Sequence, residues 1–246
     1  MHSISISPKQ VVITLISVIP LMLALQFSLR VIRWVVEQNA DPRSSTLYAL
    51  VQRLHFDSEL SVPTWYSATL LLIGAALFAL IAATKSRFQK NEVLHWQGLA
   101  ILLFYLSIDE ASSLHELTVV PLRTTFNLSG VLYFSWVVIA LPALLVLFFI
   151  YLKFFKTLPQ QTRRLLLLAI GLYVGGGLGI ELIGAHLVQL QSFNRVAYFA
   201  VSTAEEVLEM LGVNVLIYAL LTYIAREIGS IELSIRHSVS KRDPFA

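Results

Sequence analysis

Six stretches of the sequence are each long and apolar enough to cross a lipid bilayer. A transmembrane helix needs roughly 20 mostly apolar residues at about 1.5 Å of rise per residue. The six stretches are Val11–Leu29, Trp65–Thr84, Val93–Val120, Val131–Tyr151, Leu165–Leu190 and Val196–Ile224. Only 13% of the residues are charged, about half the share found in soluble domains. The sequence therefore predicts an all-α, polytopic membrane protein, a bundle of six transmembrane helices in a single membrane domain over residues 1–246.

The basic residues predict the orientation of this bundle. With the N-terminus inside, the cytoplasmic segments hold twelve Lys and Arg residues and the outer segments hold six. Cytoplasmic loops carry the excess of Lys and Arg, so both termini are expected in the cytoplasm of a cell, or inner, membrane. Because the basic residues lie at the ends of spans, nucleic acid is not expected as a partner. The first stretch is expected to be a retained helix rather than a signal peptide, because Arg30 and Arg33 follow it without a small-residue cleavage site.

The connection over residues 30–64 is long and is expected on the outer face. Its segment Thr46–Leu60 has apolar residues at helical spacing, namely Leu47, Leu50, Val51 and Leu54. This pattern predicts a short amphipathic helix on the membrane surface, with a partly ordered loop as the alternative. Three polar residues of the connection are expected to be a solvated group or a lid over a site, namely His55, Asp57 and Glu59. The polar cytoplasmic tail, residues 229–246, is expected to be frayed.

Seven of the fifteen Asp and Glu residues lie inside predicted spans that contain no Lys or Arg. They are Asp109, Glu110, Glu116, Glu181, Glu205, Glu206 and Glu209. A charged side chain at the centre of a membrane helix costs roughly 2.5–3.5 kcal/mol on insertion scales. These carboxyl groups therefore need protons, a bound cation or water.

The positions of these groups along their spans predict two shared levels. Counted from the cytoplasmic ends, one level lies roughly 25 Å up the helices and holds Asp109, Glu110, Glu181 and Glu209. A second level, roughly 8–10 Å further out, holds His115, Glu116, His186, Glu205 and Glu206. The helical period also places Asp109, Ser112, Ser113 and Glu116 on one face of the third span. We expect these groups to line one cavity open to the outer face.

Glycine recurs every four residues in the fifth span, at Gly171, Gly175 and Gly179. Small residues at this spacing let two helices approach closely. The alternative is that they thin the helix so that a ligand or a hinge fits against it. The four Trp residues lie near span ends, as in an aromatic belt, and no chemistry is assigned to them. They are Trp34, Trp65, Trp96 and Trp136.

Carboxylates and imidazoles that converge in a low-dielectric space are typical of a metal site. The expected ligands are Asp109, His115, Glu116, Glu181, His186, Glu205 and Glu209. Oxygen-rich ligation with two His residues suits a divalent Fe, Mn or Zn ion. Glu110 or Glu206 is then the candidate general base, and Ser112 or Ser113 the candidate contact of a substrate carbonyl. The chain has no Cys, so thiolate sites are excluded, and the spans contain neither Glu-x-x-His nor His-Glu-x-x-His.

Four functions are compatible with these residues. The first is a metal-dependent membrane enzyme, a hydrolase or an oxidoreductase, that acts on a lipid or another membrane-dissolved substrate. The second is a proton- or cation-coupled transporter that uses the same carboxylates. The third is a haem protein with His115 and His186 as axial ligands. The fourth is a structural subunit in which the acids only fix helix pairing.

Overall fold

The computed structural model describes residues 7–38, 44–56, 58, 60–85, 90–190 and 194–229, with the side chains of 44, 45, 90 and 91 left out. Its elements are helical throughout, with no strand in these ranges. The α-helices are α1 (Pro8–Gln38), α2 (Ser44–Arg53), α3 (Val62–Lys85), α4 (Lys90–Ser112), α5 (Val119–Phe126), α6 (Val137–Thr157), α7 (Gln160–Val174), α8 (Glu181–Gln189) and α9 (Arg195–Tyr223). The other elements are two 3-10 turns, η1 (His115–Thr118) and η2 (Gly130–Leu132), and two π-helical segments, η3 (Gly175–Ile180) and η4 (Ile224–Ile228).

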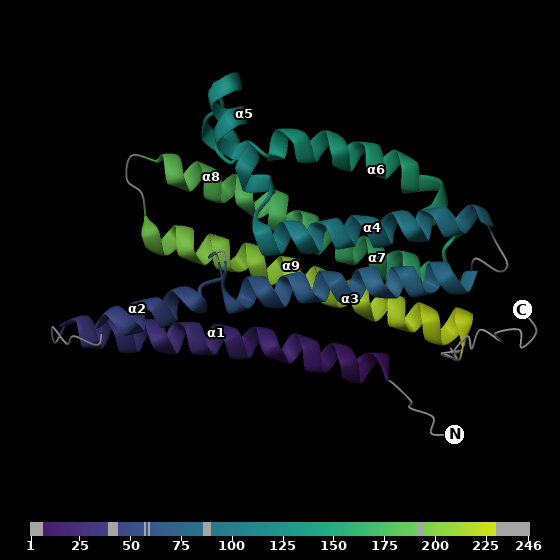
Figure 1. The fold of residues 1–246 in the computed structure, drawn as a ribbon, viewed down its shortest axis with the longest axis horizontal. Coiled ribbons are helices and arrows are strands. Elements are labelled where there is room, and N and C mark those ends of the chain that lie inside the picture. Colours follow the sequence, from purple (N-terminus) through teal and green to yellow (C-terminus); the bar gives the residue numbers. More distant parts are fainter. Residues whose placement is uncertain are drawn as a thin grey trace, which may run out of the picture.

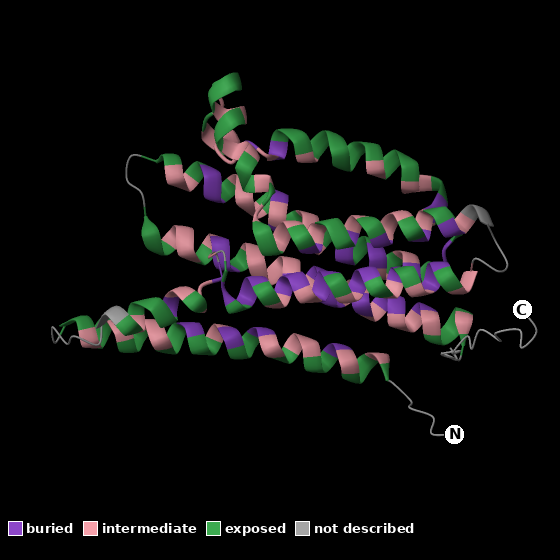
Figure 2. Ribbon diagram, viewed as in Figure 1, coloured by how far each residue is buried: buried purple, intermediate pink, exposed green. Residues whose placement is uncertain are grey.

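The long helices lie side by side, and the start of α1 and the end of α9 are at the same end of the bundle (Figure 1). Helix α9 is central, because it packs against α1, α3, α7 and α8. The core lies where α3, α4 and α9 meet and contains Leu71, Phe78, Trp96, Met210 and Ile217. Figure 2 shows buried residues along α3 and α9, whereas α5 and most of α6 are exposed. Much of the exposed surface of α6 is apolar, as on a helix that faces lipid.

In the described part of the chain, five segments are long and apolar enough to cross a membrane, as expected for a membrane protein. They are Pro8–Gln38, Val62–Lys85, Val137–Thr157, Gln160–Gln189 and Arg195–Ile228. The all-α prediction is therefore confirmed, and the count of six spans is supported for five. Helix α4 is not among them, because Asp109 and Glu110 at one end and His95 and Gln97 at the other shorten its apolar stretch.

The predicted third span, Val93–Val120, is not one helix. Helix α4 ends at Ser112, and Ser113 adopts a left-handed conformation with φ of 49°. The chain then continues as η1 and α5, which points away from the bundle (Figure 1). The prediction that Asp109, Ser112, Ser113 and Glu116 share one face of a single helix is therefore wrong. The count of helical rise that placed His115 above Asp109 also does not apply beyond Ser112.

The predicted fifth span is continuous but contains a π-helical segment at its glycines. The close helix approach does not involve the predicted glycines, because a Cβ added to Gly171, Gly175 or Gly179 would meet no described atom within 4 Å. Instead, a Cβ on Gly176 would lie 2.9 Å from the backbone oxygen of Glu205 and 3.1 Å from Cγ of Glu209. A Cβ on Gly177 would likewise meet the carboxyl group of Glu209. Ala169 and Tyr173 of α7 also contact α9, and Gly176 follows them at the i+7 and i+3 positions of the same helix face.

The outer connection contains a helix, as one of the two alternatives predicted, although α2 (Ser44–Arg53) begins and ends earlier than expected. It packs against α1 and buries Val51, which is 2% exposed. His55 is partly buried rather than solvated. Asp57, Glu59 and tail residues 230–246 lie outside the described residues. Trp96 is 0% exposed and belongs to the core rather than to an aromatic belt.

Candidate functional site

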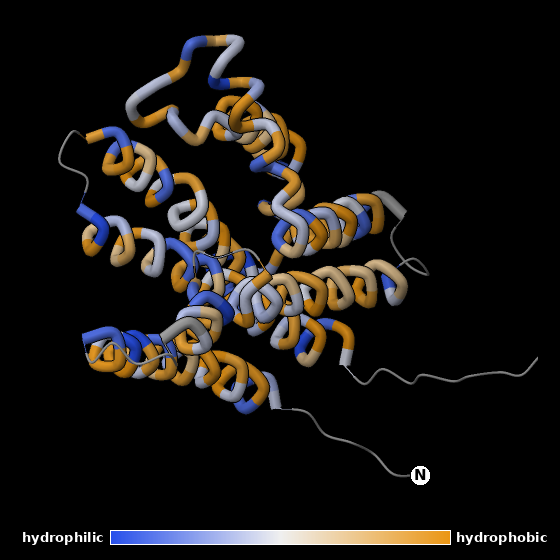
Figure 3. Tube along the Cα trace, turned by 60° about the vertical axis from the view of Figure 1, so that its left-hand side comes forward, coloured by the Kyte–Doolittle hydropathy of each residue, from blue (hydrophilic) through white to orange (hydrophobic). Residues whose placement is uncertain are grey.

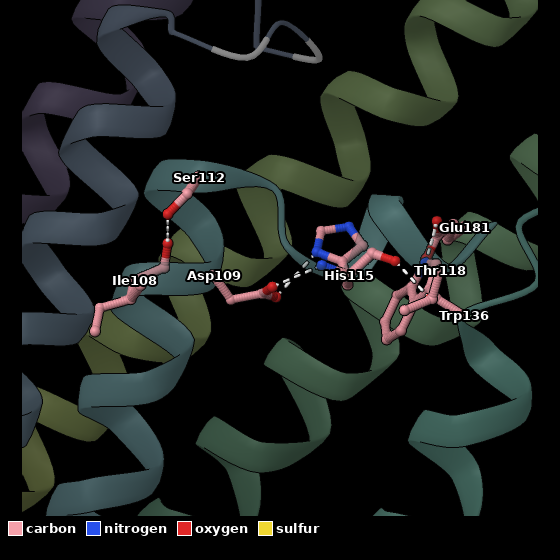
Figure 4. A network of polar contacts seen from close by, with 7 residues as sticks. All are labelled: Ile108, Asp109, Ser112, His115, Thr118, Trp136 and Glu181. Atoms are coloured by element: carbon pink, nitrogen blue, oxygen red, sulfur yellow. Dashed lines mark hydrogen bonds and ion pairs between the residues drawn. The ribbon is translucent and has the colours of Figure 1, made fainter. Parts of the chain in front are cut away.

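The end of α4 and the turn after it bring Asp109 and His115 together. Oδ1 of Asp109 accepts a hydrogen bond from the backbone N–H of His115 at 2.8 Å, and Oδ2 lies 2.9 Å from Nδ1 of the His115 ring (Figure 4). The hydroxyl of Thr118 donates to the carbonyl of His115 at 2.7 Å. The left-handed Ser113 allows this return of the chain. Both carboxylate oxygens of Asp109 therefore hold one residue, His115, in place.

The contact with Asp109 occupies Nδ1 of His115 and leaves Nε2 for the rest of the site. A carboxylate can only accept hydrogen bonds, so in the tautomer that suits a carboxylate at Asp109, Nδ1 is the donor. The other ring nitrogen, Nε2, then carries the lone pair and lies on the side of the ring away from Asp109. A proton acceptor or a metal ligand needs such a nitrogen.

Trp136 and Glu181 form a second polar pair beside His115. The indole Nε1 of Trp136 donates to Oε1 of Glu181 at 2.7 Å, and the Trp136 ring centroid lies 4.9 Å from that of His115 (Figure 4). Glu181 also interacts electrostatically with His115. Sequence reasoning missed Trp136, because 45 residues separate it from Glu181 and nothing in its local pattern differs from an interfacial Trp. The structure thus joins the turn before α6 to the first turn of α8.

Glu209 interacts electrostatically with the other carboxyl groups predicted at its level. The Glu209 carboxyl interacts electrostatically with those of Glu110, Glu181 and Asp109, and also with Glu205 on its own helix. Glu209 packs on the glycines of η3, so α9 and η3 are close at this point. Glu110 in turn interacts with Asp109 and His115. Glu209 on α9 therefore lies within electrostatic range of carboxyl groups on both α4 and α8.

The other predicted ligands are placed differently. Glu116 and His186 are exposed, and Glu205 and Glu206 are partly buried on α9. Ser112 is exposed, and its hydroxyl donates to the Ile108 carbonyl of its own helix (Figure 4). Among the residues that the structure describes, no three His, Asp or Glu side chains are placed to hold one metal ion. The seven-residue ligand set therefore stays a prediction, as do the roles of Ser112, Glu110 and Glu206 in catalysis.

Comparison with known proteins identifies a family whose function is unknown. A family model described as "Domain of unknown function (DUF8692)" matches residues 13–224. No curated protein matches the chain, and no solved structure does.

Proposed function

Because this chain belongs to a family described only as a domain of unknown function (DUF8692), we propose a function from its site alone: a membrane enzyme in which His115 is the general acid–base group. The observation that carries the proposal is the contact of Asp109 Oδ2 with Nδ1 of His115 at 2.9 Å. A carboxylate at Nδ1 holds the imidazole in one tautomer and stabilises its protonated form. A positioned acid–base group of this kind contributes about 10²–10⁴-fold to a rate.

The residues around His115 support proton transfer at Nε2. Glu181 lies beside the ring and is held by Trp136, so a proton taken up by His115 meets a nearby negative group. Favourable charge of this kind stabilises an imidazolium formed during the reaction. The exposed surfaces of α4 and α6 near the site are apolar. We therefore propose that the substrate is a lipid or another molecule dissolved in the membrane.

A second candidate function is metal binding, and it rests on a different observation. The carboxyl of Glu209 lies within electrostatic range of those of Glu110 and Glu181, and like charges at a site of low dielectric are not all ionised unless a cation compensates them. Metal-bound His residues also commonly donate their other N–H to a carboxylate, as His115 does to Asp109. In this candidate, Nε2 of His115 and Glu181 bind a divalent Fe, Mn or Zn ion. Glu110 or Glu206 is then the general base.

The orientation belongs to the same proposal. We place α4 across the membrane as the sixth span, both termini in the cytoplasm and the site open to the outer face. The absence of Cys from the chain allows a direct test with single cysteines at Ser129 and Thr157, on the two sides of α6. A membrane-impermeant maleimide should label Ser129→Cys in intact cells and Thr157→Cys only after lysis. The reverse pattern would contradict the orientation.

The enzyme proposal is tested with the full chain in lipid nanodiscs that contain a total lipid extract. Products are followed by mass spectrometry for the wild type, Asp109→Asn and His115→Gln. Both variants should form product at least about 100-fold more slowly. The control is Glu227→Gln, an exposed acid of η4 at the opposite end of α9, and it should match the wild type. Equal product formation by His115→Gln would refute the acid–base role.

Elemental analysis of the same samples separates the two candidates. Stoichiometric Fe, Mn or Zn in the wild type that is lost in His115→Gln and Glu181→Gln would favour the metal site. Product formation without bound metal would favour the acid–base pair alone. Vesicles with an imposed pH gradient test the transporter: uptake that depends on Glu181 and Glu209, without product formation, would replace both candidates.

A further inference from the structure

A cationic cavity of about 390 Å³ lies where the end of α1, helix α2 and the start of α9 meet. Its lining includes Arg30, Arg33 and Arg195, together with His55, Tyr198 and Phe199. The lining residues that the structure describes include no Asp or Glu. A cavity of this volume is in the range of small-molecule sites. Three arginines in its lining indicate an anionic ligand.

The arginines of this cavity have hydrogen-bonding capacity left for a ligand. Nε of Arg30 is buried and makes no hydrogen bond to any described residue, although its guanidinium carbon lies 3.8 Å from the centroid of the Phe199 ring. Arg33 donates through Nε to Glu37 at 2.7 Å, and its guanidinium carbon lies 4.5 Å from the centroid of the Tyr48 ring. A buried N–H without an acceptor is unfavourable. A ligand oxygen in the cavity would supply this acceptor.

His55 reports on the charge of the same cavity. Burial and the positive charge of Arg30 lower the pKa of His55 to about 4, so its imidazole is neutral at pH 7. Burial is the larger of these two causes, and the charge of Arg30 is the smaller. The positive charge of the cavity therefore comes from its arginines, and His55 adds none of its own.

The position of the cavity along the spans suggests where the anion comes from. Arg30 directly follows the apolar run of α1, and Arg195 directly precedes that of α9. Figure 3 shows that hydrophilic segments gather toward the helix ends while the lengths of the helices are hydrophobic. Both arginines therefore lie where lipid headgroups meet the hydrocarbon region. The aromatic walls formed by Tyr198 and Phe199 suit a ligand with an apolar part.

We propose that this cavity binds the phosphate of an anionic lipid headgroup through Arg30, Arg33 and Arg195. Phosphate suits three arginines better than a carboxylate does, because its oxygens accept from more than one guanidinium fork at the same time. The site is independent of the Asp109–His115 pair. A free phosphate shares the recognised group, and the experiment separates the two sources.

Binding is measured by native mass spectrometry of the full chain titrated with palmitoyl-oleoyl phosphatidylglycerol or the corresponding phosphatidylcholine. The wild type should bind phosphatidylglycerol about tenfold more tightly, because the choline headgroup cancels the phosphate charge. Arg195→Gln, at an exposed position, should weaken phosphatidylglycerol binding about tenfold. Arg30→Lys should do the same, because lysine lacks the planar fork. The control is Arg123→Gln, whose guanidinium stacks on Tyr133 outside the cavity, and it should bind like the wild type.

The outcomes separate the sources and can overturn the proposal. In one outcome, inorganic phosphate displaces phosphatidylglycerol at equal concentration, and its binding depends on Arg30 and Arg195 in the same way. This result would support the phosphate site and identify a soluble anion as its ligand. Equal binding of the two lipids by the wild type, without any phosphate binding, would overturn the proposal. The proposal would also be overturned if Arg195→Gln and Arg30→Lys bound phosphatidylglycerol as tightly as Arg123→Gln does.

Discussion

Replacing Gly212 by alanine should force α7 and α9 apart, because the two helices contact each other through backbone atoms at this point. A Cβ on Gly212 would lie 2.7 Å from the backbone nitrogen of Tyr173 and 2.9 Å from the carbonyl oxygen of Ala169. Favourable contacts of carbon lie near 3.5–4.0 Å, so the helices must separate locally by roughly 0.7–1 Å. Neither neighbouring atom belongs to a flexible side chain, so no rotamer change relieves the clash.

The size of the effect follows from this separation. A gap of about 0.5–1 Å forfeits roughly a quarter to a half of each van der Waals contact across the interface. Overpacking a core site lowers the free energy of unfolding by about 1–3 kcal/mol. The higher helix propensity of alanine offsets up to about 1 kcal/mol of this loss. We expect a net loss of about 1–2 kcal/mol for Gly212→Ala. For a chain of this size, each 1 kcal/mol lowers Tm by about 2–4 °C.

The matched control is Gly171→Ala. Gly171 also lies inside a helix of the same pair, and a Cβ there meets no described atom within 4 Å. This variant should be as stable as the wild type or gain up to about 1 kcal/mol. Thermal unfolding followed by Trp fluorescence in one detergent compares the three proteins. A Tm for Gly212→Ala at or above that of Gly171→Ala would refute the close approach of α7 and α9.

Three further predictions concern the turn after α4, the Trp136–Glu181 pair and the outer connection. Ser113→Gly should be more stable than Ser113→Val by about 1–2 kcal/mol, because φ of 49° disfavours a branched side chain; equal Tm values would contradict the left-handed turn. Trp136→Phe removes the N–H that Glu181 accepts and should lose about 1–3 kcal/mol, whereas Trp65→Phe, at a residue 72% exposed, should lose little by the same measurement. Burial and the charge of Arg30 lower the pKa of His55 to about 4 in the folded state. In the unfolded state the pKa of this imidazole is near 6.5, so the unfolded state binds a proton more readily. Stability should therefore fall as the pH drops from 6.5 toward 4; a His55→Leu variant should show a shallower slope of Tm against pH, and an unchanged slope would exclude His55 as its source.

The sequence alone determined the class of the protein and much of its helix layout. Hydropathy is a sum over a window of neighbouring residues, so the apolar segments at Pro8–Gln38 and Arg195–Ile228 are visible without any tertiary information. The same holds for α2, whose apolar residues recur at helical spacing. The concentration of acids near residues 109, 181 and 209 was also visible, because charged residues stand out in apolar spans.

Only the tertiary structure decided how these residues meet. Helical periodicity predicted a continuous span through Ser113, but the Asp109 carboxylate accepts the backbone N–H of His115, and this bond offers the chain an alternative to another helical turn. The choice of Gly176 over Gly175 at the α9 contact depends on which face of α7 packs against α9, the face that also carries Ala169 and Tyr173. The pairs Trp136–Glu181 and Arg30–Phe199 join residues far apart in the chain. Local patterns record the burial of each helix face but not which distant side chain lies opposite it, because that depends on how the helices pack.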